Sequence, residues 1–183
     1  MGMIERYPRS CLFLGVIAVG SLSWLLSGTW WSIVLFIILL LGPAIEDGRS
    51  GYISDGWSLL IATSGMITSW QMGHGWESVL SALIILSLYG LLWLIRKEAA
   101  GMGDVLLSGA IVLWLTPVFA LLFLWLASVL ALVWYGLVCL YERSVARRGV
   151  RFAPFLALGG GMAYGLQEMV GLSLFTPLWL FAR

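Results

Sequence analysis

Long apolar runs separated by short polar segments are the feature that most constrains this chain. Seven runs follow one another, over residues 12–26, 30–45, 57–70, 78–95, 104–115, 118–140 and 152–170. Hydrophobic residues make up 61% of the 183 residues and charged residues only 10%, unlike a soluble domain. Because a membrane-embedded backbone must satisfy its own hydrogen bonds, such runs favour helices. We expect an all-α fold, a polytopic membrane helix bundle of about seven transmembrane helices.

The remaining organisation follows from the lengths of the polar segments. None exceeds about a dozen residues, so residues 1–183 are expected to form a single integral membrane domain. Residues 172–182 form either a short eighth span or an interfacial segment. Any chemistry must then take place within the bundle or at its edge.

Basic residues indicate how the bundle is oriented. With the N-terminus inside, the loops at 46–56, 96–103 and 141–152 also lie inside. The N-terminal segment and these loops hold nine of the ten basic residues, namely Arg6, Arg9, Arg49, Arg96, Lys97, Arg143, Arg147, Arg148 and Arg151. Since cytoplasmic loops are rich in Lys and Arg, we expect a cytoplasmic N-terminus and a multi-pass topology.

Two aspartates stand at the inner ends of apolar runs. Asp104 ends the sequence Gly101-Met102-Gly103-Asp104, directly before the fifth run, and Asp47 follows the second run. The runs at 57–70 and 78–95 leave the inner side and return to it between them. Both carboxylates are therefore predicted to lie at the same membrane depth, where an ionisable group suggests a function.

Two neighbouring carboxylates can share a proton and act as base and acid in peptide hydrolysis. Asp104 begins a helix, whose N-terminus stabilises an anion, so we expect Asp104 to be the more readily ionised member. Arg49 is the nearby cation that could reverse this order. Gly101 and Gly103 permit a tight or positive-φ backbone and close approach of a substrate strand; the alternative is a merely flexible turn.

Other chemistries lack the necessary residues. One histidine and two cysteines cannot form a zinc protease site or a disulfide framework, so we expect no metal and no cofactor. A serine protease would need His74, which falls on the outer side, or Lys97, which resembles a helix-end anchor. The alternative to an enzyme is a membrane transporter or assembly scaffold with structural or ion-handling aspartates.

Three stretches of the chain resemble the type IV prepilin peptidase family, the G-x-G-D membrane aspartyl proteases. Residues 47–57 (DGRSGYISDGW) are similar to the family's D-x-R-x-x-x-I-P-N segment, and residues 101–105 (GMGDV) match its second-aspartate motif. Residues 151–159 (RFAPFLALG) are similar to P-F-G-P-F-L-A-L-G. The resemblance spans roughly residues 35–165, and order and spacing agree.

The chain departs from the family pattern at a few positions. Ser54 and Asp55 replace the usual Pro-Asn, Leu106 stands where a lysine is common, and Ala153 replaces a glycine before Pro154. None of these changes removes an aspartate. Glu46, next to Asp47, leaves open which carboxylate faces the site, although the family register favours Asp47.

The resemblance implies an intramembrane aspartyl endopeptidase that removes the basic leader peptide from type IV prepilin or pseudopilin precursors. It implies Asp47 and Asp104 as catalytic residues, supported by Gly101, Gly103, Arg49 and Pro154. The expected location is the bacterial inner membrane, with the active site at the cytoplasmic face. The expected partners are the precursor and the lipid bilayer, with no nucleic acid; a preflagellin peptidase is the close alternative.

Many family members also carry a cysteine-bearing domain after the first helix that methylates the trimmed pilin. In this chain only Ser27-Gly28-Thr29 separates the first two apolar runs. We therefore expect a peptidase without N-methyltransferase activity.

Overall fold

The computed structural model describes residue 18 and residues 29–95, 101–141 and 151–170 of the protein, and the regular elements within these ranges are helices. They are α2 (Thr29–Ser50), α3 (Asp55–Gln71), α4 (Gly75–Ile95), α5 (Met102–Val112), α6 (Pro117–Tyr141) and α7 (Ala153–Val170). The all-α prediction is confirmed for this part of the chain. The expected helix at 12–26 and the segment at 172–182 lie outside it, and the total of about seven spans remains a prediction.

Three of these helices are long and apolar enough to cross a membrane, at Trp31–Ser50, Gly75–Leu92 and Pro117–Leu140. Only 22% of the span in α6 is buried inside the protein, and many of its large apolar side chains, such as Trp125 and Leu132, are exposed, as a lipid-facing surface requires. The eleven residues of α5 rise about 16 Å, roughly half of a hydrocarbon core. The fifth apolar run is thus a short buried helix rather than a full crossing.

Helix α2 continues further than its apolar run. The run ends at Ile45, but the helix reaches Ser50 and includes Pro43. Gly51 then ends it with a φ of +68°, and its N–H donates to the Asp47 carbonyl at 2.9 Å. This is a left-handed helix cap, which glycine adopts without a steric penalty. Asp47 consequently lies in the last helical turn rather than in a loop after the helix.

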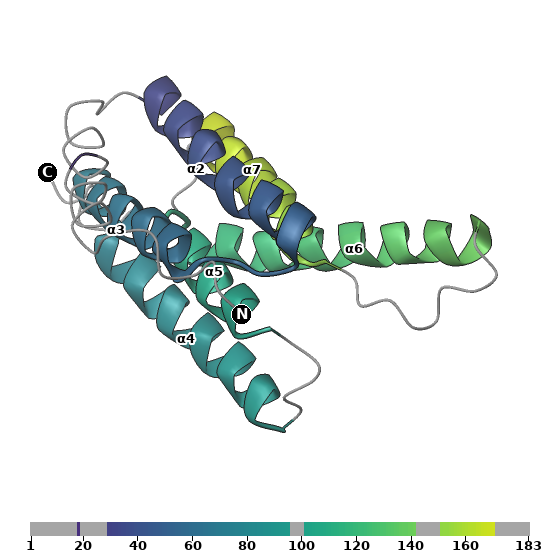
Figure 1. Ribbon diagram of the computed structural model, residues 1–183. Helices are drawn as coiled ribbons and strands as arrows, with labels where there is room; N and C mark the ends of the chain where they lie inside the picture. The colour runs from purple at the N-terminus through teal and green to yellow at the C-terminus, as the bar shows by residue number, and fades with distance from the viewer. Residues whose placement is uncertain (1–17, 19–28, 96–100, 142–150, 171–183) are drawn as a thin grey trace, which may run out of the picture.

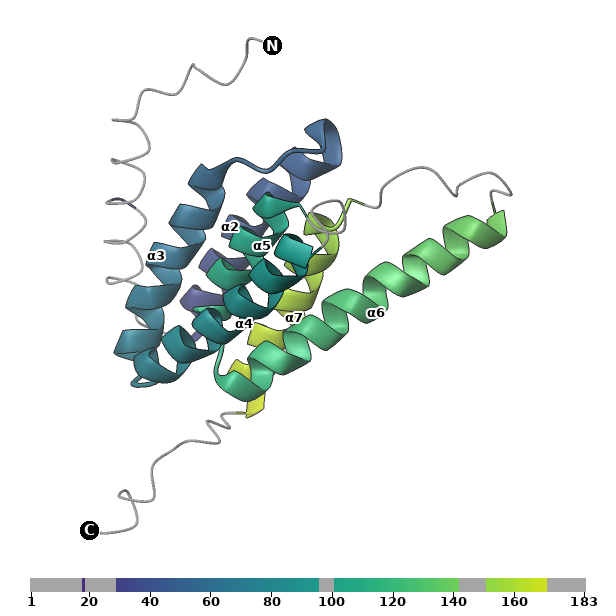
Figure 2. The same cartoon turned by 90° about the horizontal axis from the view of Figure 1, so that it is seen from below.

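The helices pack around α5 (Figure 1). Helices α3 and α4 form an antiparallel hairpin against α5, while α2 and α7 lie side by side. The first part of α6 packs on α7, with Ala127 against Gly159, and its last turns project beyond the bundle, as Figure 2 also shows.

Trp114, in the connection between α5 and α6, is the centre of the core. Its ring lies 4.7 Å from that of Phe36 on α2 and 5.5 Å from that of Tyr164 on α7. Its Nε1–H donates to the Ile61 carbonyl of α3 at 2.9 Å, and Gly65 of α3 leaves room for the indole. One side chain therefore joins four parts of the bundle.

Buried side chains also form hydrogen bonds with the backbone groups at the break between α5 and α6. Pro117 cannot donate a backbone hydrogen bond, so carbonyls before it need other partners. Ser78 of α4 donates to the Leu115 carbonyl at 2.9 Å, and Gln167 of α7 bonds both the Thr116 N–H and the Trp114 carbonyl. These contacts fix the end of the bundle opposite to the aspartates.

Candidate active site

The loop between α2 and α3, the first turn of α5 and the start of α7 lie at one end of the bundle. The loop after α2 and the start of α5 together surround a pocket of about 390 Å³. Its lining residues are Asp47, Gly51, Tyr52, Ile53, Asp55, Gly101, Met102, Gly103 and Asp104. The structure therefore brings the two predicted aspartates into one pocket, although 57 positions separate them in the sequence (104 − 47).

Asp47 is the aspartate that the end of α2 places in this pocket. It is only 6% exposed, and its Oδ2 has no hydrogen-bond partner within the described ranges. Neighbouring Glu46 has a different role, because its Oε2 accepts a hydrogen bond from the Ser54 N–H at 3.1 Å. Glu46 thus fixes the first residues before α3, and the ambiguity between the two carboxylates is settled geometrically in favour of Asp47.

The start of α7 supplies the positive surroundings of Asp47. The backbone N–H of Ala153 bonds its carboxylate, and the Arg151 guanidinium lies close enough for a charge interaction. Arg151 also donates to the Gly48 carbonyl, which ties the segment before α7 to the end of α2. A helix N-terminus carries partial positive charge and stabilises a carboxylate.

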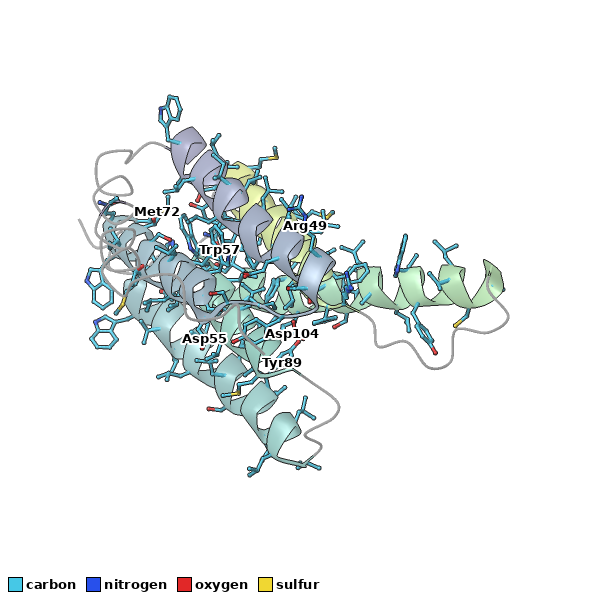
Figure 3. The ribbon with its side chains drawn as sticks, viewed as in Figure 1. Arg49, Asp55, Trp57, Met72, Tyr89 and Asp104 are labelled. Atoms are coloured by element: carbon cyan, nitrogen blue, oxygen red, sulfur yellow. The ribbon has the colours of Figure 1, made fainter. Side chains whose placement is uncertain are left out.

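The two supporting residues predicted around Asp47 lie outside the pocket lining. Arg49 is exposed on the last turn of α2 (Figure 3). Pro154 is the second residue of α7, a position that proline favours because no helical N–H is required there. Its place is consistent with a role in starting the helix whose first amide meets Asp47.

Asp104 lies in the first turn of α5, and the glycines before it have steric roles. Gly101 precedes the helix with φ −69° and ψ 139°, so of the two possibilities, a tight or a positive-φ backbone, the positive φ does not occur at Gly101. A Cβ at Gly101 would lie 3.2 Å from Asp104 Oδ2, and one at Gly103 would lie 3.3 Å from the Ile53 Cβ. Both glycines are therefore explained by close approach of neighbouring groups.

The electrostatics of Asp104 differ from the sequence expectation. Asp104 lies outside the three helices that are long enough to cross a membrane. The pKa of Asp104 is raised to about 6, chiefly by burial and also by the charge of Asp47, while a hydrogen bond with the Gly101 backbone opposes the change. The expectation that the helix N-terminus makes Asp104 the readily ionised member is wrong, because desolvation outweighs the helix dipole.

Two residues near the aspartates were not predicted as site residues. Tyr89 of α4 lies beside Asp104, close enough for their charges to interact (Figure 3). From the sequence, Arg151 was predicted only as a basic residue of an inner loop and as the first residue of the motif at 151–159. Tyr89 comes from α4 and Arg151 from the residues just before α7, and only the Arg-Phe-Ala-Pro motif before α7 gave a signal for either.

Other titratable groups lie away from the pocket. His74 is buried in the turn between α3 and α4, with Nδ1 3.0 Å from Ser78 Oγ, at the opposite end of α3 from Asp55. Within the described ranges, no three His, Cys, Asp or Glu side chains gather closely enough to hold a metal ion. The pocket itself offers carboxylates, backbone amides and one neighbouring guanidinium.

Comparisons with known proteins bear on the family of the chain. Residues 33–136 match the type IV leader peptidase family. The chain is also 26% identical over 177 residues to the type 4 prepilin-like proteins leader peptide-processing enzyme of Escherichia coli O78:H11 (strain H10407 / ETEC). The alignment covers 90% of this chain and 63% of that relative. No solved structure matches the chain.

Proposed function

Because this chain belongs to the type IV leader peptidase family, we propose that it is an intramembrane aspartyl endopeptidase with Asp47 and Asp104 as its catalytic pair. The observation that supports this most strongly is the shared pocket. Two carboxylates from separate motifs line it, and the surrounding charges differ for each. Such a difference suits one group to act as base and the other as acid.

The two aspartates take different parts in hydrolysis. Asp47, beside the α7 N-terminus and Arg151, acts as the carboxylate base and removes a proton from water. The resulting hydroxide attacks the scissile carbonyl carbon, while the carboxylic acid of Asp104 donates its proton to the carbonyl oxygen. When the tetrahedral intermediate collapses, the proton held by Asp47 passes to the leaving amine, one hydroxyl of the intermediate returns its proton to Asp104, and the C–N bond breaks.

The substrate we propose is the basic leader of type IV prepilin or pseudopilin precursors, cut at the cytoplasmic face of the inner membrane. The inner-side location is supported by basic residues, because Arg49 on the last turn of α2 and Arg151, which donates to the Gly48 carbonyl, both lie close in the chain or in space to Asp47 of the pocket. The carboxyl groups of Asp47 and Asp104 line the pocket and suit a basic segment. The alternative, a preflagellin precursor as the substrate, is tested by giving each purified precursor to the enzyme and comparing the cleavage rates.

We also propose that the protein does not methylate the trimmed product. The basis is the three-residue separation, at 27–29, between the first two apolar runs. These residues lie mostly outside the described ranges, so the proposal depends on the sequence. Incubation with a precursor and a radiolabelled methyl donor should yield trimmed but unlabelled product, and label in the product would contradict it.

The experiment that tests the peptidase proposal uses single Asn substitutions in proteoliposomes that contain a pilin precursor. Asp47→Asn and Asp104→Asn should each reduce cleavage by about 10²–10⁴-fold, the usual contribution of a general acid or base. Asp55→Asn is the matched control, because it neutralises a third, exposed carboxylate in the same pocket. It should change the rate by about twofold or less.

Two outcomes of this experiment would contradict the peptidase proposal. If either catalytic variant cleaves at the wild-type rate, the pair model is wrong. If the wild-type protein cleaves no precursor while remaining folded, a transporter or assembly role becomes the better reading of the aspartates.

A further inference from the structure

A second hollow, an apolar groove, adjoins the aspartate pocket. It has a volume of about 490 Å³ and lies between α3, α4 and α5. Helix α5 contributes Leu106, Gly109 and Leu113, which recur at helical spacing along one face. The step from Leu106 to Leu113 corresponds to about 10 Å of rise, or roughly two turns. The groove therefore extends from the level of the pocket toward the middle of the bundle.

Small residues allow a chain to approach the walls of this groove closely. Ala62 of α3 and Ala82 of α4 line it, while Gly109 lets the Leu86 side chain of α4 pack directly on α5. In a bilayer, where burial from water no longer drives association, small residues at a helix surface promote close packing of another helix. The groove thus has the composition of a helix-binding surface.

The groove and the aspartate pocket adjoin at Asp55. Asp55 lines both, and Leu106 lies only two residues after Asp104. Ser58, one turn after Asp55, also lines the groove; it is 7% exposed, and its Oγ has no partner within the described ranges. A polar group of this kind at the junction can bond a peptide backbone that passes from one hollow into the other.

We propose that this groove binds the apolar segment of the substrate that adjoins the scissile bond. A polypeptide whose peptide bond lies between the aspartates must leave the pocket, and this groove is an apolar exit at membrane depth. The polarity of the two hollows then matches a substrate with a polar leader and an apolar continuation. Leu106 and Ala62 would determine which apolar segments fit, and the proposal rests on the peptidase function.

Leu106 gives the groove its apolar character next to the catalytic pair. A lysine there, as in the family pattern, would place a cation between the pocket and the groove. The leucine instead extends the apolar surface to within two residues of Asp104. The chain is accordingly suited to a substrate whose apolar residues begin close to the cleavage point.

The test fills the groove and compares two substrates in proteoliposomes. Ala62→Trp, two turns away from Asp55, should reduce kcat/KM for a complete pilin precursor by about 10-fold, equivalent to about 1.4 kcal/mol. It should leave unchanged the slower cleavage of a truncated precursor that ends a few residues after its leader junction. Leu86→Trp, on the opposite wall, should have the same effect.

The matched control is Leu83→Trp, which adds the same side chain to an exposed, lipid-facing position of α4 outside the groove. It should alter neither substrate. Equal losses for both substrates in the groove variants, or no loss for either, would overturn the proposal.

A second readout does not depend on cleavage. Benzoylphenylalanine in place of Leu59, which lines the groove, should cross-link the precursor on illumination, whereas the same group at Leu83 should not. Adducts only with lipid, with the same chain or with a second copy would refute substrate binding in the groove. Cross-linking of a precursor that the wild-type protein never cleaves would instead refute the peptidase proposal and retain the groove.

Discussion

Replacement of Gly101 by alanine tests whether the position of the Asp104 carboxylate controls the reaction. The added Cβ would lie 3.2 Å from Oδ2 and 3.9 Å from Cγ of Asp104, so the carboxylate must move by a few tenths of an ångström. A misplacement of about 1 Å can cost about 100-fold in rate. We therefore expect the single-turnover cleavage rate to fall between about threefold and tenfold.

The thermal stability of this variant should stay close to that of the wild type. Gly101 has φ −69° and ψ 139°, a conformation open to any residue, and it is exposed. The matched control is Gly51→Ala, in the same pocket, where φ is +68° and nothing lies within 4 Å of the new Cβ. It should lose about 1 kcal/mol of stability and keep its cleavage rate.

The assay is rapid-mixing cleavage of a saturating precursor in proteoliposomes, with thermal unfolding measured on the same samples. If Gly101→Ala cleaves at the wild-type rate, the position of the Asp104 carboxylate does not limit the reaction. If both glycine variants lose rate in proportion to their stability, the loss is structural, and the steric reasoning is wrong.

Three further predictions concern charge and packing. Asp104 has a pKa raised to about 6 and acts as the acid, so its active, protonated form is lost as the pH rises through about 6. Above that pH, kcat/KM should decrease with a slope that approaches tenfold per pH unit. A flat profile from about pH 5 to 8 would contradict this. Arg151→Ala should reduce kcat more than Arg49→Ala, since Arg151 contacts the end of α2; equal effects would argue against that contact. Gly65→Ala should lower the free energy of unfolding in detergent by about 1–3 kcal/mol, because the added Cβ would overlap the Trp114 ring. An unchanged unfolding temperature would count against the packing described.

The parts of the fold that follow from hydropathy were predictable. Apolar runs located the described helices, and counting crossings placed Asp47 and Asp104 at one end of the bundle. Boundaries were less certain, since α2 continues through Asp47 to Ser50. The apolar run reports the part of a helix that avoids water, and a helix can continue beyond it.

The parts of the site that depend on tertiary packing were not predictable. The Arg-Phe-Ala-Pro motif marked Arg151 but not its contact with Asp47 or that of the Ala153 amide, because these contacts depend on how α7 packs beside α2. The same holds for Tyr89, which faces Asp104 from α4. The order of ionisation was misjudged for a related reason: the helix dipole is visible in the sequence, whereas burial is a property of the packed bundle.

A double-mutant measurement tests the central claim, that the two aspartates act as one catalytic unit. Single-turnover cleavage of a precursor would be compared for Asp47→Asn, Asp104→Asn and the variant that carries both substitutions. Groups that act together are strongly non-additive, so the double variant should cleave about as slowly as either single variant. Losses that multiply in the double variant would show that the aspartates act independently and would contradict the account.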